Sequence, residues 1–131
     1  MKCLAIDDSN TVRLALKLVL ESQGYKMEMA CDGEEAMRKI RVSSDFDLII
    51  TDINMPKMDG ITFIREIRKL SNYRSTPIVV VTTESKPEKV AEVTMAGANG
   101  WVAKPFKPYE LISTLNKLRE KPLEAELQGQ L

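Results

Sequence analysis

The chain of 131 residues contains no histidine, and this absence removes three kinds of chemistry. It excludes acid–base catalysis by an imidazole, metal ligation by histidine, and a phosphohistidine carried by the chain itself. Only two cysteines are present, Cys3 and Cys31. In a parallel sheet they would lie at opposite ends of their strands, roughly 15 Å apart at about 3.3 Å per residue, too far for a disulfide. We expect two small buried thiols, as is usual in the cytoplasm.

A charge bias and a long apolar run are also missing. The 19 basic residues equal the 19 acidic ones, so the net charge does not favour nucleic acid or a membrane as the main partner. No apolar run approaches the roughly 20 residues that span a bilayer, and the first residues lack the layout of a signal peptide. The length suits one domain with a proper core. We therefore expect a monomeric, single-domain, cytoplasmic protein.

Five short apolar segments alternate with longer segments of helical periodicity. The strand candidates are residues 2–7, 26–30, 48–51, 78–82 and 100–103. This alternation predicts an α/β fold of the (βα)5 type, a doubly wound five-stranded parallel sheet. The fourth helical segment, with Pro87 in its first turn, is weakly amphipathic. The fifth begins at Pro108, and its pattern stops at Pro122.

Residues 121–131 are expected to form a C-terminal tail beyond a domain of residues 1–120. Leu123, Leu127 and Leu131 recur at helical spacing after Pro122. The tail is therefore either flexible or a short amphipathic helix, which would be marginal on its own. We expect that deleting residues 122–131 leaves the domain folded.

Three carboxylates follow two of the predicted strands. Asp7 and Asp8 end the first, and Asp52 follows the third. Ligands of open α/β sheets bind beyond the carboxyl ends of the strands, so these acids would share one cleft if the two strands are neighbours. Their repulsion calls for a cation, and hard oxygen ligands without histidine or cysteine favour Mg²⁺. The alternative is that the acids are helix caps or turn residues, which suits Asp8 best.

A hydroxyl and an ammonium reach the same edge. Thr82 ends the fourth strand, and Lys104 lies just past the fifth. Taken alone, Thr82 would be an ordinary strand residue and Lys104 an ordinary solvated turn residue. Together with the acids they compose a site with a nucleophilic carboxylate, a hydroxyl donor and a counter-charge. In the loop after Asp52, Pro56 should stiffen the chain and Gly60 should adopt a conformation that other residues resist.

Four motifs, taken as a set, are specific: "DD", "DINMPKMDG", "VVVTT" and "KPF". The chain thereby resembles, over residues 1 to about 120, the receiver domain of bacterial two-component response regulators, particularly the stand-alone CheY-like chemotaxis proteins. The resemblance implies the flavodoxin/CheY-like strand order 2-1-3-4-5. CheY is itself an example of the rule that ligands of open α/β sheets bind beyond the carboxyl ends of the strands. The site predicted from that rule and the site implied by the resemblance are therefore not independent predictions.

The resemblance also implies roles for individual residues. Asp52 would be the phosphoacceptor, Lys104 would pair with the phosphoryl oxygens, and Thr82 would move to hydrogen-bond one of them. The implied Mg²⁺ ligands are Asp8, Asp52, the backbone carbonyl of Asn54 and, through water, Asp7. The peptide bond between Lys104 and Pro105 would be cis.

The implied function is a signalling switch and not an enzyme. A sensor histidine kinase, or a small acyl phosphate, would supply the phosphoryl group. The surface of residues 86–96, 100–103 and 108–119 would bind the downstream protein, with a flagellar motor switch or a phosphatase as candidates. Trp101 stands where a tyrosine or phenylalanine switch is usual, and it is either such a switch or a packing residue. Because Asn54 and Glu84 are not bulky and apolar, water should reach the phosphoryl group and its lifetime should be short.

Other functions stay open at this point. Within the family, the chain could be a phosphorelay intermediate or a regulator of another pathway. A flavodoxin-like FMN module would need a Ser/Thr/Gly-rich phosphate loop, where this chain has "DDSNTVR". A hydrolase of the haloacid dehalogenase type would pair the nucleophile with an acid two residues later, where this chain has Asn54.

Overall fold

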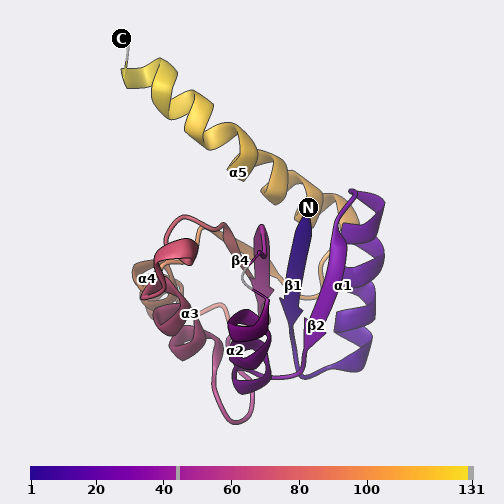
Figure 1. The fold of residues 1–131 in the computed structure, drawn as a ribbon. Helices are drawn as coiled ribbons and strands as arrows, with labels where there is room; N and C mark the ends of the chain where they lie inside the picture. Colours follow the sequence, from indigo (N-terminus) through magenta and orange to yellow (C-terminus); the bar gives the residue numbers. More distant parts are fainter. Residues whose placement is uncertain (44, 130–131) are drawn as a thin grey trace.

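This computed structural model describes residues 1–43 and 45–129, with side chains described as far as Arg119. Within them the strands are β1 (Lys2–Ile6), β2 (Lys26–Ala30), β3 (Leu48–Thr51), β4 (Ile78–Thr82) and β5 (Gly100–Ala103). They form one parallel sheet in the order β2-β1-β3-β4-β5 (Figure 1). The predicted fold class and strand order are confirmed, and β1 ends one residue earlier than predicted.

The helices cover both faces of this sheet. They are α1 (Asn10–Ser22), α2 (Gly33–Val42), α3 (Gly60–Arg68), α4 (Pro87–Ala96) and α5 (Pro108–Gly129), with a short 3-10 helix at Ser71–Tyr73. In Figure 1, α1 lies on one side of the sheet, and α2, α3 and α4 lie on the other. Helix α5 packs on the α1 side through Leu111 and Leu115. The site at the sheet edge therefore rests on a closed three-layer core.

Alternating strand residues divide that core into two halves. In β1, Leu4 and Ile6 face the α2–α4 layer, whereas Cys3 and Ala5 face α1 and α5. All four are fully buried. This follows from the period of two in a strand whose faces are both covered. Burying each large apolar side chain contributes about 1.5–3 kcal/mol, so the strand ends that carry the site are held firmly.

Side chains other than the three acids cap the first three helices. The caps are Ser9, Asp32 and Asp59, and each accepts a hydrogen bond from the backbone N–H three residues further on, at 3.3, 2.9 and 2.8 Å. Asp8 therefore has no capping role, because Ser9 occupies the cap of α1. The explanation of the acid cluster as a set of helix caps is wrong.

The structure corrects two predictions, one about the burial of a cysteine and one about the end of α5. Cys31 is exposed at the end of β2 and only Cys3 is buried, although both are free thiols as expected. Helix α5 does not stop at Pro122 but continues to Gly129. A proline inside a helix removes one backbone hydrogen bond, a loss that this helix tolerates. Side chains from residue 120 onward lie outside the described part, so the boundary at residue 120 and the role of the tail stay predictions.

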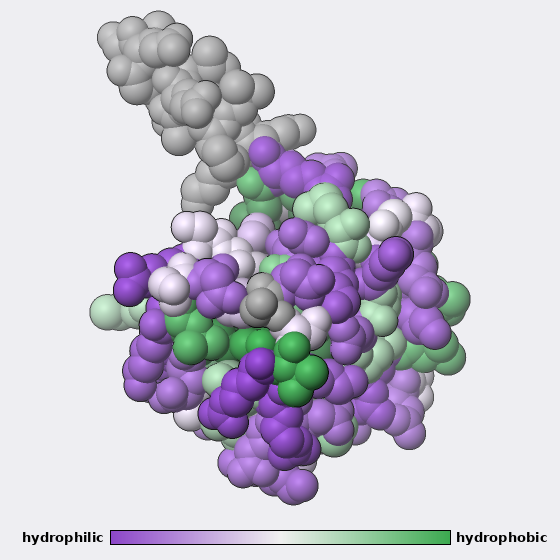
Figure 2. All heavy atoms as spheres, viewed as in Figure 1, coloured by the Kyte–Doolittle hydropathy of each residue, from purple (hydrophilic) through white to green (hydrophobic). Residues whose placement is uncertain are grey.

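The surface in the view of Figure 2 is mostly hydrophilic, with small separate hydrophobic areas. The large apolar side chains that are exposed come from several elements, among them Leu14 and Leu18 of α1, Met95 of α4 and Tyr109 of α5. Scattered exposed side chains of this kind are normal. Among the described residues, none of the helices combines the length and the apolar character that crossing a membrane requires.

Candidate functional site

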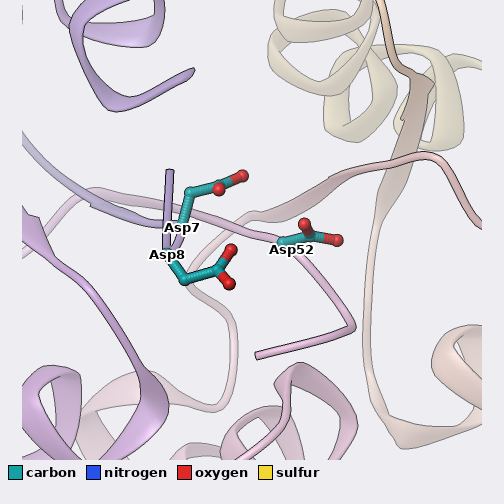
Figure 3. Close-up of side chains that lie close together, drawn as sticks. All are labelled: Asp7, Asp8 and Asp52. Carbon is teal, nitrogen blue, oxygen red and sulfur yellow. The ribbon is translucent and has the colours of Figure 1, made fainter. Parts of the chain in front are cut away.

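The acids meet because β1 and β3 are neighbours in the sheet. Ile6 of β1 is in register with Thr51 of β3, and the next residue of each strand end is an aspartate. Figure 3 shows Asp7 and Asp8 extending from the end of β1 toward the side where Asp52 lies. One carboxylate oxygen from each of the three lies within 4.8 Å of the others. The predicted convergence is confirmed.

This cluster fits a hard divalent cation. It offers carboxylate oxygens without histidine or cysteine, which is the ligand chemistry of Mg²⁺. Asp7 and Asp52 are buried, whereas Asp8 is exposed. Three like charges at this distance repel strongly, so the site is stable only with positive charge nearby. A cation of small radius would find its protein ligands already assembled.

Lys104 places a positive charge directly against two of the three carboxylates. Its Nζ donates to Oδ2 of Asp7 at 2.6 Å and to Oδ2 of Asp52 at 2.7 Å. Burial alone would lower the pKa of Lys104, but the hydrogen bonds and charges of Asp52 and Asp7 outweigh it, and the pKa is raised above 10.5. One ammonium against three carboxylates leaves a formal charge of −2. That charge is what a divalent cation would neutralise.

Lys104 reaches the cleft because of its backbone position. It follows β5, and its N–H donates to the carbonyl of Thr82 at 2.9 Å. The bond from Lys104 to Pro105 is cis, as the resemblance implied. Thus the fifth strand brings its ammonium across β4 to the ends of β1 and β3.

The two carboxylate oxygens of Asp52 accept hydrogen bonds from different groups, one from the backbone and one from Lys104. Its Oδ1 accepts from the N–H of Ile53 at 2.6 Å, and Oδ2 accepts from Lys104. Its N–H donates to the carbonyl of Ile6 at 3.0 Å, which ties it to the end of β1. The residue keeps 8% exposure, so a small group can reach the carboxylate from solvent. Chemically, this is an oriented, partly desolvated carboxylate able to act as a nucleophile.

In the loop from Ile53 to Asp59, the residue with the unusual backbone conformation is not the predicted one. Gly60 does not have a positive φ; that conformation falls on Lys57, at 66°. Gly60 is required for another reason, because a Cβ there would lie 2.0 Å from the carbonyl oxygen of Asp52. Its N–H donates to the carbonyl of Ile53 at 2.8 Å. Glycine therefore closes the loop directly against the backbone of the candidate nucleophile. Asn54 lies exposed in this loop.

Thr82 and Trp101 lie on the two strands beyond β3. Thr82 is fully buried at the end of β4, and its Oγ accepts from the N–H of Glu84 at 3.2 Å. Trp101 is half-buried in β5, in register with Val80, and it packs against the core beneath α2–α4. Both occupy the predicted places, but neither is in hydrogen-bond contact with the acids among the bonds of the described residues.

One neighbour of the site was missed from the sequence. The guanidinium of Arg13, in α1, donates to the carbonyl of Asp7 at 2.5 Å and also bonds Asn10. Its helical spacing matches a solvated face, so only the fold, which turns α1 back over the end of β1, reveals the contact. Arg13 thus braces the backbone of the acid pair.

Comparison with known proteins gives one consistent family. Residues 3–116 match the response regulator receiver domain. The chemotaxis protein CheY1 of Helicobacter pylori is 37% identical over 112 residues, which cover 85% of this chain and 90% of that protein. The crystallised chemotaxis protein CheY4 of Vibrio cholerae is 44% identical with a TM-score of 0.84, covering 89% of this chain and 97% of that one.

A second similar structure contains ligands. It is a CheX–CheY–BeF3–Mg²⁺ complex from Borrelia burgdorferi, 27% identical, with a TM-score of 0.82 and coverage of 88% of this chain and 86% of that one. These matches agree with the resemblance that the four motifs carry.

Proposed function

We propose that this chain, which belongs to the response regulator receiver domain family, changes state when the carboxylate of Asp52 accepts a phosphoryl group. Its family and its CheY relatives make it a phosphorylation-activated switch of chemotaxis signalling, with a histidine kinase as phosphodonor. The assignment of Asp52 rests on one observation. It is the buried acid that contacts Lys104 at 2.7 Å and still keeps a face open to solvent.

The transfer itself needs few groups. An oxygen of Asp52 attacks phosphorus and forms a new O–P bond, while the bond from phosphorus to the imidazole nitrogen, or to the acetate oxygen, breaks. The leaving group departs with the electron pair. Lys104 stands beside the attacked position and pairs with a phosphoryl oxygen. Thr82 donates its hydroxyl proton to another phosphoryl oxygen once it turns away from the N–H of Glu84.

Receiver domains bind Mg²⁺ in an acidic pocket, and this chain has such a pocket. We assign Asp8, Asp52 and the carbonyl of Asn54 as direct ligands. We assign Asp7 a role through water, as the family resemblance implies. When bound, Mg²⁺ supplies the charge that offsets the phosphoryl oxygens.

Loss of the phosphoryl group should be quick. Asn54 is exposed and Glu84 is half-buried, and neither side chain forms an apolar cover over Asp52. Water therefore has access to the acyl phosphate. The chain would promote its own phosphorylation by small acyl phosphates and its own dephosphorylation, without turning over an external substrate in the manner of an enzyme.

The output surface is proposed to be α4, β5 and the described part of α5. Thr82 connects the cleft to α4, and Lys104 connects it to α5, so both elements can respond to a phosphoryl group. The complex of a Borrelia burgdorferi CheY with CheX, BeF3 and Mg²⁺ supports the proposal that the phosphoryl-like state binds a partner protein. The downstream target, such as a motor switch protein or a phosphatase, is characterised by its preference for the phosphorylated state. A cytoplasmic location is consistent with the two free thiols.

The decisive experiment is intact-mass spectrometry after incubation with acetyl phosphate and Mg²⁺. The wild type should gain one phosphoryl group, and Asp52→Asn should gain none. Asp59→Asn is the matched control, because it changes an exposed acid of the same loop to a residue that also caps helices. Labelling that persists in Asp52→Asn would show that another residue is the acceptor.

A phosphorelay role, or control of another pathway, remains the second candidate function. The cleft is the same in each case, and the difference lies in the partner. Transfer of the phosphoryl group from Asp52 to a histidine protein, measured with labelled chain, would favour the relay. Binding of a chemotaxis target by the phosphorylated chain alone would favour the direct switch.

A further inference from the structure

Arg68, in the last turn of α3, is a half-buried cation that plays no part in the cleft. Its Nη1 donates to the carbonyls of Tyr73 and Thr76 at 2.6 and 2.7 Å. Its Nη2 and Nε donate to the carbonyl of Gly97 at 2.7 and 3.2 Å, and Nη2 also donates to Oδ1 of Asn99 at 2.8 Å. Among the ion pairs of the described residues, none involves Arg68. The guanidinium is held entirely by neutral oxygens.

These contacts join three segments at the amino edge of the sheet, opposite the cleft. Gly97 and Asn99 form the turn from α4 to β5, and Asn99 pairs with Ile78 at the start of β4 through two hydrogen bonds. Gly97 has a φ of 126°, and a Cβ there would lie 2.8 Å from Arg68. The turn is thus shaped around the guanidinium. Gly97 is the C-cap of α4, so the negative C-terminal end of that helix adds to the attraction.

The other end of α4 is attached much less firmly. Its N-cap, Lys86, makes no side-chain capping bond, and the helix buries only Val93, which lies in the C-terminal half. Toward the middle of α4, an exposed ion pair joins Arg65 of α3 to Glu92 at 3.9 Å, and it contributes little. Along about 15 Å of helix, therefore, the fixed end is the one at Arg68 and the loose end is the one that continues from Thr82.

We infer that Arg68 is a positioning residue for the switch: it fixes the C-terminal end of α4, so that a change at the cleft displaces only the first turns of that helix. Trp101 follows the fixed turn by two residues, so its backbone keeps its place relative to α3. The output surface then changes at residues 86–91 while the backbone of residues 97–101 stays in place. This inference rests on the proposed phosphorylation of Asp52.

The geometry of the fork explains why arginine is needed. Five hydrogen bonds run from one planar guanidinium to four acceptors in two separate turns. A lysine keeps the charge, but its single ammonium cannot span these acceptors. Arg68→Lys is therefore the variant that loosens the turn while keeping the charge. Arg65→Lys is the matched control, because it makes the same change one turn earlier on the same helix.

Hydrogen–deuterium exchange with and without Mg²⁺ and beryllofluoride tests the inference. In the wild type and in Arg65→Lys, the ligand should change exchange in residues 83–91 and leave residues 97–101 unchanged. In Arg68→Lys the amides of Gly97 and Ala98 should exchange at least about tenfold faster, and the ligand effect should extend into residues 97–101. Phosphorylation by acetyl phosphate should stay within about twofold of the wild type, because the cleft is intact.

The outcomes separate this inference from the proposed function. A wild type that shows no ligand effect anywhere contradicts the switch itself. A wild type that responds, with Arg68→Lys showing the same exchange map, overturns the role of Arg68, as does a wild-type ligand effect centred on residues 97–101. If Arg68→Lys does not fold, Asn99→Ala is the second variant, because it removes one acceptor of the guanidinium. It should give a smaller extension of the ligand effect into residues 97–101. If the ligand effect does not extend in this variant, the inference is overturned.

Discussion

Two basic residues, Lys104 and Arg68, each tie separate segments together, at opposite edges of the sheet. Lys104 bridges two carboxylates, and Arg68 bridges three carbonyls and one amide oxygen. An ammonium between like charges is easily given new partners, because a phosphoryl group offers the same kind of oxygen. A guanidinium held by fixed backbone carbonyls has no competing ligand. The contacts of Lys104 can therefore change when a phosphoryl group binds, whereas the contacts of Arg68 stay the same.

The largest effect should come from removing the cation at the changing edge. Lys104→Met takes away the ammonium beside the attacked phosphorus, and transfer from acetyl phosphate should slow by about 100- to 1000-fold. Lys104→Arg keeps the charge but places a planar fork where two oxygens surround one nitrogen at 2.6 and 2.7 Å. It should recover only part of the rate. Initial rates of phosphorylation measure both, and a wild-type rate in Lys104→Met would contradict the assigned role.

At the opposite edge the same kind of deletion should affect stability and not chemistry. Arg68→Ala leaves three part-buried carbonyls without this donor, and the free energy of unfolding should fall by about 2–4 kcal/mol. Urea unfolding followed by circular dichroism measures it. Arg65→Ala, which loses only an exposed ion pair, should change stability by less than about 0.5 kcal/mol. Equal effects of the two variants would remove the contrast between the edges.

Binding of Mg²⁺ should sharpen the comparison, because only the acidic edge has ligands for it. At about 100 times its dissociation constant, Mg²⁺ should raise the free energy of unfolding of the wild type by about 2.7 kcal/mol. Asp8→Asn should reduce this gain at the same Mg²⁺ concentration, whereas Arg68→Lys should keep it. Thermal unfolding with and without Mg²⁺ gives the values. A gain that is unchanged in Asp8→Asn would exclude that acid as a ligand.

A smaller effect is expected at alkaline pH without Mg²⁺. The pKa of Lys104 is raised above 10.5 by Asp52 and Asp7, against the opposing effect of burial. The lysine's contribution is therefore complete below pH 10.5 and is lost as the pH rises through the folded-state pKa. The difference in stability between the wild type and Lys104→Met should shrink above pH 10.5 and stay constant between pH 7 and 9. A difference that already shrinks below pH 9 would contradict the raised pKa.

The acidic edge was predictable from the sequence, and the opposite edge was not. Asp7, Asp8, Asp52 and Lys104 each follow an apolar strand segment directly, so local pattern and strand order are enough to bring them together. Arg68 contacts residues up to 31 positions away that are turn carbonyls and one amide, and no residue type marks such acceptors. Gly60 illustrates the same limit, because its necessity comes from the carbonyl of Asp52 and not from its own φ.

Charge added at Asp52 should change the environment of the Trp101 side chain even though the backbone of this residue stays in place, and the emission of this sole tryptophan measures that change. Adding beryllofluoride with Mg²⁺ should change the emission of the wild type, much less that of Thr82→Ala, and not that of Asp52→Asn. Mg²⁺ alone in each variant is the baseline. Identical wild-type spectra with and without beryllofluoride, under conditions where its binding is shown by mass spectrometry, would contradict the claim and leave Trp101 as a packing residue.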